Sequence, residues 1–122
     1  MIYKEGVSRK SVMPIMSLAL HHLDNLFSYY NTALVITDTY RNKKSPHYKP
    51  WSLHNIGLAV DIRKNIDHAK FVEIKKKFNN LLNDDRFQFI EYNDHYHLEY
   101  DRRYSHEAQE KQFKKFIQEN SR

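Results

Sequence analysis

The sequence predicts an α+β fold, in which a small, mainly antiparallel sheet has helices on one side. Apolar residues recur at helical spacing between residues 15 and 30, and again between residues 71 and 82. Runs of β-branched and aromatic residues, which favour strands, lie at residues 33–40, 58–62, 87–92 and 95–100. Strands and helices that do not alternate regularly are typical of the α+β class.

Three segments are predicted to be helical. The first has its apolar positions at Ile15, Ala19, Leu23, Leu26, Phe27 and Tyr30. The second begins after the capping residue Asp67, and its apolar positions are Phe71, Ile74, Phe78, Leu81 and Leu82. A third helix is expected from about residue 105 to 118, where Phe113, Phe116 and Ile117 form the apolar side.

Two connections between these elements stand out. Residues 41–51 are polar and contain Pro46 and Pro50, which predicts a loop of about ten residues. Loops of that length in compact domains are usually functional or mobile. Asn93 and Asp94 predict a tight turn between the last two strands.

Composition narrows the possible classes of protein. The chain has 122 residues, which predicts one domain spanning residues 1–122. Its 40% hydrophobic content argues against intrinsic disorder, and no apolar run is long enough to cross a membrane. The absence of cysteine excludes zinc ribbons, thiol nucleophiles and iron–sulfur clusters.

The net charge of +5 favours an anionic partner. The basic residues are spread over several segments and form no single arm or stripe, so a nucleic-acid partner is not expected. The basic and apolar residues near the N-terminus run directly into His21 and His22 without a small-residue cleavage site. The expectation is therefore a chain without a signal peptide that is made in the cytoplasm.

The first motif that carries chemistry runs from Ser52 to Asp61, with the sequence SLHNIGLAVD. Gly57, one of two glycines in the chain, permits a tight turn before the strand begins. On that strand Ala59 and Asp61 share one face, opposite the aliphatic face that enters the core. A small residue beside the carboxylate leaves room for a metal ion.

The second motif runs from Asp94 to Glu99, with the sequence DHYHLE. Strand periodicity places His95, His97 and Glu99 on one face. Together His54, Asp61 and His97 offer two nitrogens and one oxygen, which with water in the fourth position is the pattern of a catalytic zinc site. A structural zinc site would more often have four ligands rich in cysteine.

In combination, the spacing Ser52-x-His54-x-x-Gly57-x-Ala59-x-Asp61 followed by Asp94-His95-x-His97 resembles the zinc D,D-carboxypeptidase and L-alanyl-D-glutamate endopeptidase family. That family includes VanY-like carboxypeptidases and small phage endolysins, and its fold is shared with the hedgehog signalling domain. The resemblance implies that zinc is bound by His54, Asp61 and His97. It also implies that Asp94 is the catalytic carboxylate, and that Arg41 contacts substrate or the developing oxyanion.

The same resemblance matches His95 to a histidine beside the last ligand, and Ser52 to a position that contacts the site. It implies hydrolysis of the peptide stem of bacterial peptidoglycan by a zinc-bound water that Asp94 activates. An L-Ala-D-Glu endopeptidase of the endolysin type is favoured over a D-Ala-D-Ala carboxypeptidase. Such an enzyme is expected to be a monomer that acts on the cell wall after release.

Several alternatives remain open at this point. Tyr48 and Trp51 either line a substrate groove or pack in the core. A non-catalytic zinc-containing binding module of the same fold is possible, although Asp94 argues against it. A metal-dependent nuclease or nucleic-acid-binding protein is a weaker alternative. Glu91 lies six residues before His97, so it is interpreted as a surface charge on the strand.

Overall fold

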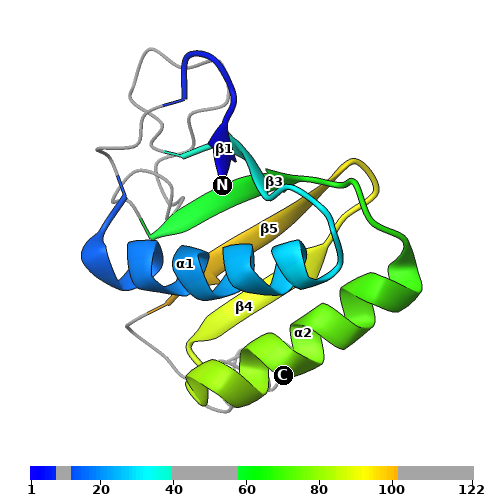
Figure 1. The fold of residues 1–122 in the computed structure, drawn as a ribbon. Coiled ribbons are helices and arrows are strands. Elements are labelled where there is room, and N and C mark those ends of the chain that lie inside the picture. Colours follow the sequence, from blue (N-terminus) through cyan, green and yellow to red (C-terminus); the bar gives the residue numbers. More distant parts are fainter. Residues whose placement is uncertain (8–11, 40–57, 102–122) are drawn as a thin grey trace, which may run out of the picture.

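In the part of the chain that the computed structural model describes, residues 1–7, 12–39 and 58–101, five strands form one sheet and two helices cover one of its faces (Figure 1). The elements are β1 (Ile2–Tyr3), α1 (Pro14–Tyr29), β2 (Val35–Asp38), β3 (Ala59–Arg63), α2 (His68–Leu82), β4 (Phe87–Glu91) and β5 (His95–Tyr100). The strands lie side by side in the order β1-β2-β3-β5-β4.

The sheet is mixed. β1 pairs parallel with β2, whereas the β2–β3, β3–β5 and β4–β5 pairings are antiparallel. The predicted α+β class is therefore confirmed, together with a small and mostly antiparallel sheet. Strand β1 was not predicted from the sequence, because a strand of two residues is too short to show a periodic pattern.

Alternation along the strands separates a core face from an open face. On β5 the side chains of Tyr96, Leu98 and Tyr100 are buried, whereas those between them are only partly buried. The buried residues of β3, β4 and β5 form one hydrophobic cluster with apolar residues of α1 and α2. Since both described helices contribute to that cluster, neither of them covers the opposite face, which is called the open face below.

Helix α1 buries a slightly different set of residues from the predicted one. Ala19, Leu23 and Phe27 are fully buried as expected, but Ile15 is 36% exposed. Met16 and Leu20 are buried instead, so the face towards the sheet is rotated by about one residue at the start of the helix. Pro14 at the start of the helix fits there, because the first helical N–H groups need no partner within the helix.

Helix α2 begins as the sequence predicts. The Asp67 carboxylate accepts a hydrogen bond from the Lys70 backbone N–H at 2.8 Å, which satisfies one free donor of the first turn. The helix buries Phe71, Ile74 and Phe78 against the sheet. It ends at Asn83, which adopts a left-handed conformation with φ of 48°.

The turn between β4 and β5 is also confirmed. The Tyr92 backbone N–H donates to the His95 carbonyl oxygen at 2.9 Å, which closes the turn around Asn93 and Asp94. The predicted loop at residues 41–51 and the predicted helix at residues 105–118 lie outside the described residues. Among the described helices, neither is long and apolar enough to cross a membrane.

The cap of α2 gives a first testable prediction. Asp67→Ala removes the acceptor for the Lys70 N–H, so the free energy of unfolding is expected to fall by about 1 kcal/mol. Asp67→Asn keeps a capping oxygen and should lose much less. Urea denaturation of the three proteins measures the difference, and equal losses in both variants would contradict the assigned cap.

Candidate functional site

The open face of the sheet gathers polar side chains from β3 and β5. The antiparallel register places Asp61 directly opposite His97, Ala59 opposite Glu99 and Arg63 opposite His95. Residues paired in this way have their Cβ atoms about 5 Å apart, so their side chains meet on the same face. The pairing therefore joins the two sequence motifs at one place.

The central contact is between Asp61 and His97. Asp61 Oδ1 lies 2.9 Å from His97 Nδ1. Both groups are largely withdrawn from solvent, with Asp61 only 9% exposed. On the other side of the ring, His97 Nε2 lies 3.2 Å from Glu99 Oε1. The imidazole therefore sits between two carboxylates.

This environment changes the charge of His97. Burial of the imidazole lowers its pKa, but the hydrogen bonds and negative charges of Asp61 and Glu99 more than offset burial and raise the pKa to about 9. Without a metal ion, the ring is therefore protonated at neutral pH and donates to both carboxylates. A metal ion that uses Nδ1 must displace the proton held there.

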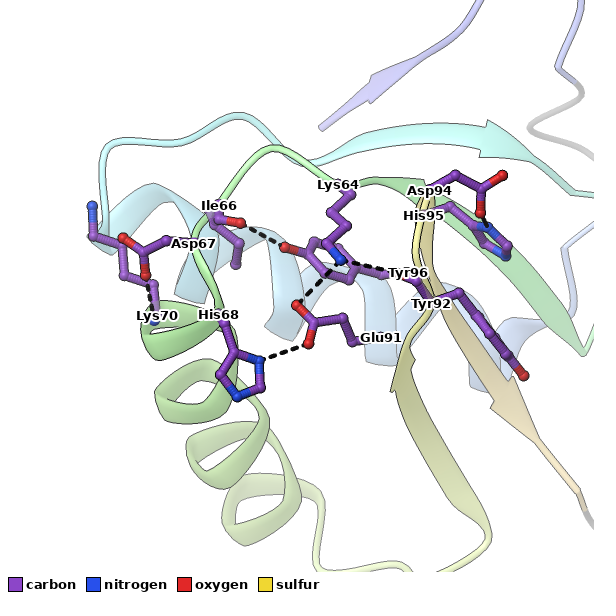
Figure 2. A network of polar contacts seen from close by, with 10 residues as sticks. All are labelled: Lys64, Ile66, Asp67, His68, Lys70, Glu91, Tyr92, Asp94, His95 and Tyr96. Carbon is purple, nitrogen blue, oxygen red and sulfur yellow. Dashed lines mark hydrogen bonds and ion pairs between the residues drawn. The ribbon is translucent and has the colours of Figure 1, made fainter.

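A second pair lies beside the first. His95 Nδ1 lies 2.6 Å from Asp94 Oδ1. Figure 2 shows the two side chains in contact at the turn between β4 and β5. The hydrogen bond from His95 and the charge of the ring lower the pKa of the Asp94 carboxyl below its ordinary value, so it is ionised at neutral pH. His95 Nε2 lies 3.7 Å from Asp61 Oδ1. The His95 ring therefore lies between Asp94 and the Asp61–His97 pair.

Tyr92 packs against both histidines. Its ring stacks on that of His95, with the centroids 5.0 Å apart and an interplanar angle of 23°. The rings of Tyr92 and His97 meet edge to face, with their centroids 6.2 Å apart. Tyr92 is thus an aromatic wall of the site, and 46% of it remains exposed.

The orientation of β5 is fixed from the core side by Tyr96, between the two histidines. Its hydroxyl donates to the Ile66 carbonyl oxygen at 2.9 Å (Figure 2). Its ring stacks on that of Phe71, with the centroids 4.8 Å apart. Tyr96 is fully buried. Because adjacent side chains point to opposite faces, anchoring Tyr96 in the core directs His95 and His97 to the open face.

Glu91 lies on the opposite face of the sheet from His95 and His97. It pairs in register with Tyr96, and it follows the buried Phe87 and Phe89 at alternate positions of β4. His68 Nδ1 donates to its carboxylate at 2.7 Å, and Lys64 Nζ lies 3.6 Å away (Figure 2). These partners lower the pKa of Glu91. Glu91 is therefore a paired charge between β4 and the start of α2, remote from the site chemistry.

A cavity of about 680 Å³ opens beside the Asp61 carboxylate. It is lined by Lys4, Thr37, Asp38, Asp61, Arg63, Asp94 and His95. A larger cavity of about 1040 Å³ lies between the end of α2 and β4, and it contains none of the predicted site residues. The smaller cavity is the relevant one, because it holds a base candidate and a ligand candidate together.

Asp38 reaches this cavity because of a bulge in β2. The register shifts between Ile36, which pairs with Ile62, and Asp38, which pairs with Asp61. Without the extra residue, Asp38 would share the core face with Ile36, two positions earlier. The bulge turns the Asp38 carboxylate to the same side as Asp61.

The spacing of the Asp61 and His97 donor atoms is close to that of two ligands of a zinc ion. Two ligand atoms of a tetrahedral zinc site lie about 3.3 Å apart, given metal–ligand distances near 2 Å. The 2.9 Å between Asp61 Oδ1 and His97 Nδ1 needs only a small opening to reach that value. Within residues 1–7, 12–39 and 58–101, no group of three or more His, Cys, Asp or Glu side chains is arranged to hold a metal ion. The third expected ligand, His54, lies outside these residues.

The structure brings together four predicted site residues, Asp61, Asp94, His95 and His97. The others, Arg41, Tyr48, Trp51, Ser52 and His54, lie outside the described residues. No protein-family model, no curated protein and no solved structure matches this chain.

Several residues at the site were not predicted, namely Lys4, Asp38, Arg63, Tyr92 and, as a partner of His97, Glu99. Two of them could have been found from strand alternation. Arg63 lies two positions after Asp61 and Glu99 lies two positions after His97, so each shares a strand face with a predicted ligand. Lys4 has no such signal, because its position depends on the pairing of β1 with β2.

The charge on His97 predicts a pH dependence of stability in the metal-free protein. The pKa is raised in the folded state, to about 9 from an ordinary value of 6.5. The stabilisation is therefore fully present below pH 6.5, declines as pH rises towards 9, and is absent above it. The loss is expected to be on the order of 3 kcal/mol.

Urea denaturation between pH 6 and 10 in the presence of a chelator measures this loss. His97→Gln should show a flatter dependence, and His21→Gln, which changes a histidine on the outer side of α1, should keep the wild-type slope. A wild-type slope in His97→Gln would show that the stabilising proton resides elsewhere.

Proposed function

We propose that this protein is a zinc-dependent peptidase that hydrolyses the peptide stem of bacterial peptidoglycan, with a fold of the hedgehog and D-Ala-D-Ala-peptidase type. The observation that carries the proposal is the meeting of Asp61 and His97 across β3 and β5, with the Asp94–His95 pair next to them. Asp61 and His97 supply two of the three ligands that this proposal requires, and the ionised Asp94 carboxylate supplies a base for metal-assisted hydrolysis.

In this proposal, His54, Asp61 and His97 hold the metal ion. A zinc ion in such a site polarises the scissile carbonyl and lowers the pKa of water to about 7. Nitrogen and oxygen donors without thiolate suit zinc, and the three-ligand set is typical of catalytic sites.

Asp94 is the proposed general base. Its carboxylate is 87% exposed and faces the cavity, so an attacking water and a substrate amide can reach it. The hydrogen bond from His95 keeps it ionised and oriented. Asp94 accepts a proton from the water and returns it to the leaving amine, while Arg41 stabilises the charge on the carbonyl oxygen.

The cavity also suits an anionic peptide. Lys4, which directly follows β1, and Arg63 of β3 line it, and neither side chain forms an ion pair with another described residue. The stem peptide carries free carboxylates, and D-Glu places one next to the L-Ala-D-Glu bond. The terminal D-Ala carboxylate lies equally close to the D-Ala-D-Ala bond, so the two cations suit either substrate. We favour an L-Ala-D-Glu endopeptidase over a D-Ala-D-Ala carboxypeptidase on the resemblance in sequence to small phage endolysins, with Ser52, Tyr48 and Trp51 as further substrate contacts. The proposed enzyme is a monomer that acts on the wall after release, as a phage endolysin does.

The first test is mass spectrometry of the fragments released from purified peptidoglycan, with and without a chelator. Stem fragments should appear only with metal present, and their new termini name the bond that is cut. The His97→Ala protein should release none. If the wild-type protein binds zinc and releases nothing from several wall types, a non-catalytic zinc-containing binding module replaces the peptidase.

The role of Asp94 has a test of its own. Asp94→Asn removes the proton acceptor without touching a metal ligand, so turnover should fall at least 100-fold, in line with the usual contribution of general base catalysis. The zinc content, measured by atomic emission, should stay at the wild-type value. Unchanged turnover in this variant would remove Asp94 from the mechanism.

A further inference from the structure

We propose that Glu99 is a positioning residue that fixes the ring of His97 so that Nδ1 is the atom offered to the metal ion. This inference rests on the proposed zinc site. The observation behind it is the contact between Glu99 Oε1 and His97 Nε2, at 3.2 Å.

The chemistry of the two groups determines where the proton lies. An ionised carboxylate can only accept hydrogen bonds, so the nitrogen that faces Glu99 must carry a proton. A neutral imidazole has one protonated nitrogen and one free lone pair. With the proton held at Nε2, the lone pair lies on Nδ1, which faces Asp61 Oδ1 at 2.9 Å. The ring therefore presents its lone pair to the other proposed ligand.

The sheet holds Glu99 in this position. Residues 97 and 99 are neighbours on the open face of β5, and the residue opposite Glu99 on β3 is Ala59. The small side chain of Ala59 leaves the space that the Glu99 carboxylate needs beside the ring. The Glu99 side chain is only 21% exposed, so its hydrogen bond is partly shielded from water.

Such a contact also strengthens the ligand. A carboxylate that accepts a hydrogen bond from a metal-bound histidine increases the basicity of the ligating nitrogen, and its loss typically costs 10- to 100-fold in metal affinity.

The test is zinc affinity, measured by competition with a chromophoric chelator. Glu99→Ala should bind zinc 10- to 100-fold more weakly than the wild-type protein. Glu99→Gln keeps an acceptor oxygen without the charge. Its zinc affinity should therefore lie between those of the wild-type protein and Glu99→Ala. Glu91→Gln is the matched control, because it makes the same change on the neighbouring strand but on the opposite face. It should bind zinc as the wild-type protein does.

A second readout separates positioning from general loosening of the fold. In the zinc-loaded wild-type protein, the ¹⁵N NMR shifts of the His97 ring should show a protonated Nε2 and a metal-bound Nδ1. Zinc bound through Nε2, or wild-type affinity in Glu99→Ala, would overturn the role of Glu99 while the zinc site stands. Failure of the wild-type protein to bind zinc would overturn both this inference and the proposed function.

Discussion

The antiparallel pairing of β3 with β5 is the constraint on which the candidate site depends. It places Asp61 opposite His97, although the two residues lie 36 positions apart in the chain. The pairing is held from the other face, where Val60 and Ile62 of β3 pack in one cluster with Tyr96 and Leu98 of β5. Since a shift of one residue would turn every side chain to the wrong face, the hydrophobic core also fixes the geometry of the site.

The charges on the open face form a connected set. Asp61 contacts His97 and lies within ion-pair distance of His95, which in turn donates to Asp94. Without metal, His97 is protonated, because the carboxylates of Asp61 and Glu99 stabilise the charged ring by more than its burial destabilises it. Because a metal ion at Nδ1 must displace that proton, we expect zinc affinity to depend on pH. The site is therefore both a stabilising ion-pair network and a candidate ligand set.

The sequence predicted most of the fold that the structure describes, because periodicity and capping are local. The start of α2 at Asp67 and the limits of β5 follow from such signals. Other features depend on tertiary structure: β1 is defined only by its partner, and Asp38 reaches the cavity only through a bulge. The faces of Asp61 and His97 were predictable from alternation, whereas the contact between them depends on strand order, which has no local signature.

The most direct test of the proposed zinc site is the anomalous diffraction of a zinc-loaded crystal at the zinc absorption edge. We predict one strong peak between Asp61 Oδ1 and His97 Nδ1, with His54 as the third protein ligand. A peak elsewhere on the molecule, or none at this position at full zinc loading, would contradict the proposed site. The cross-strand pair of Asp61 and His97 would then be a structural ion pair alone.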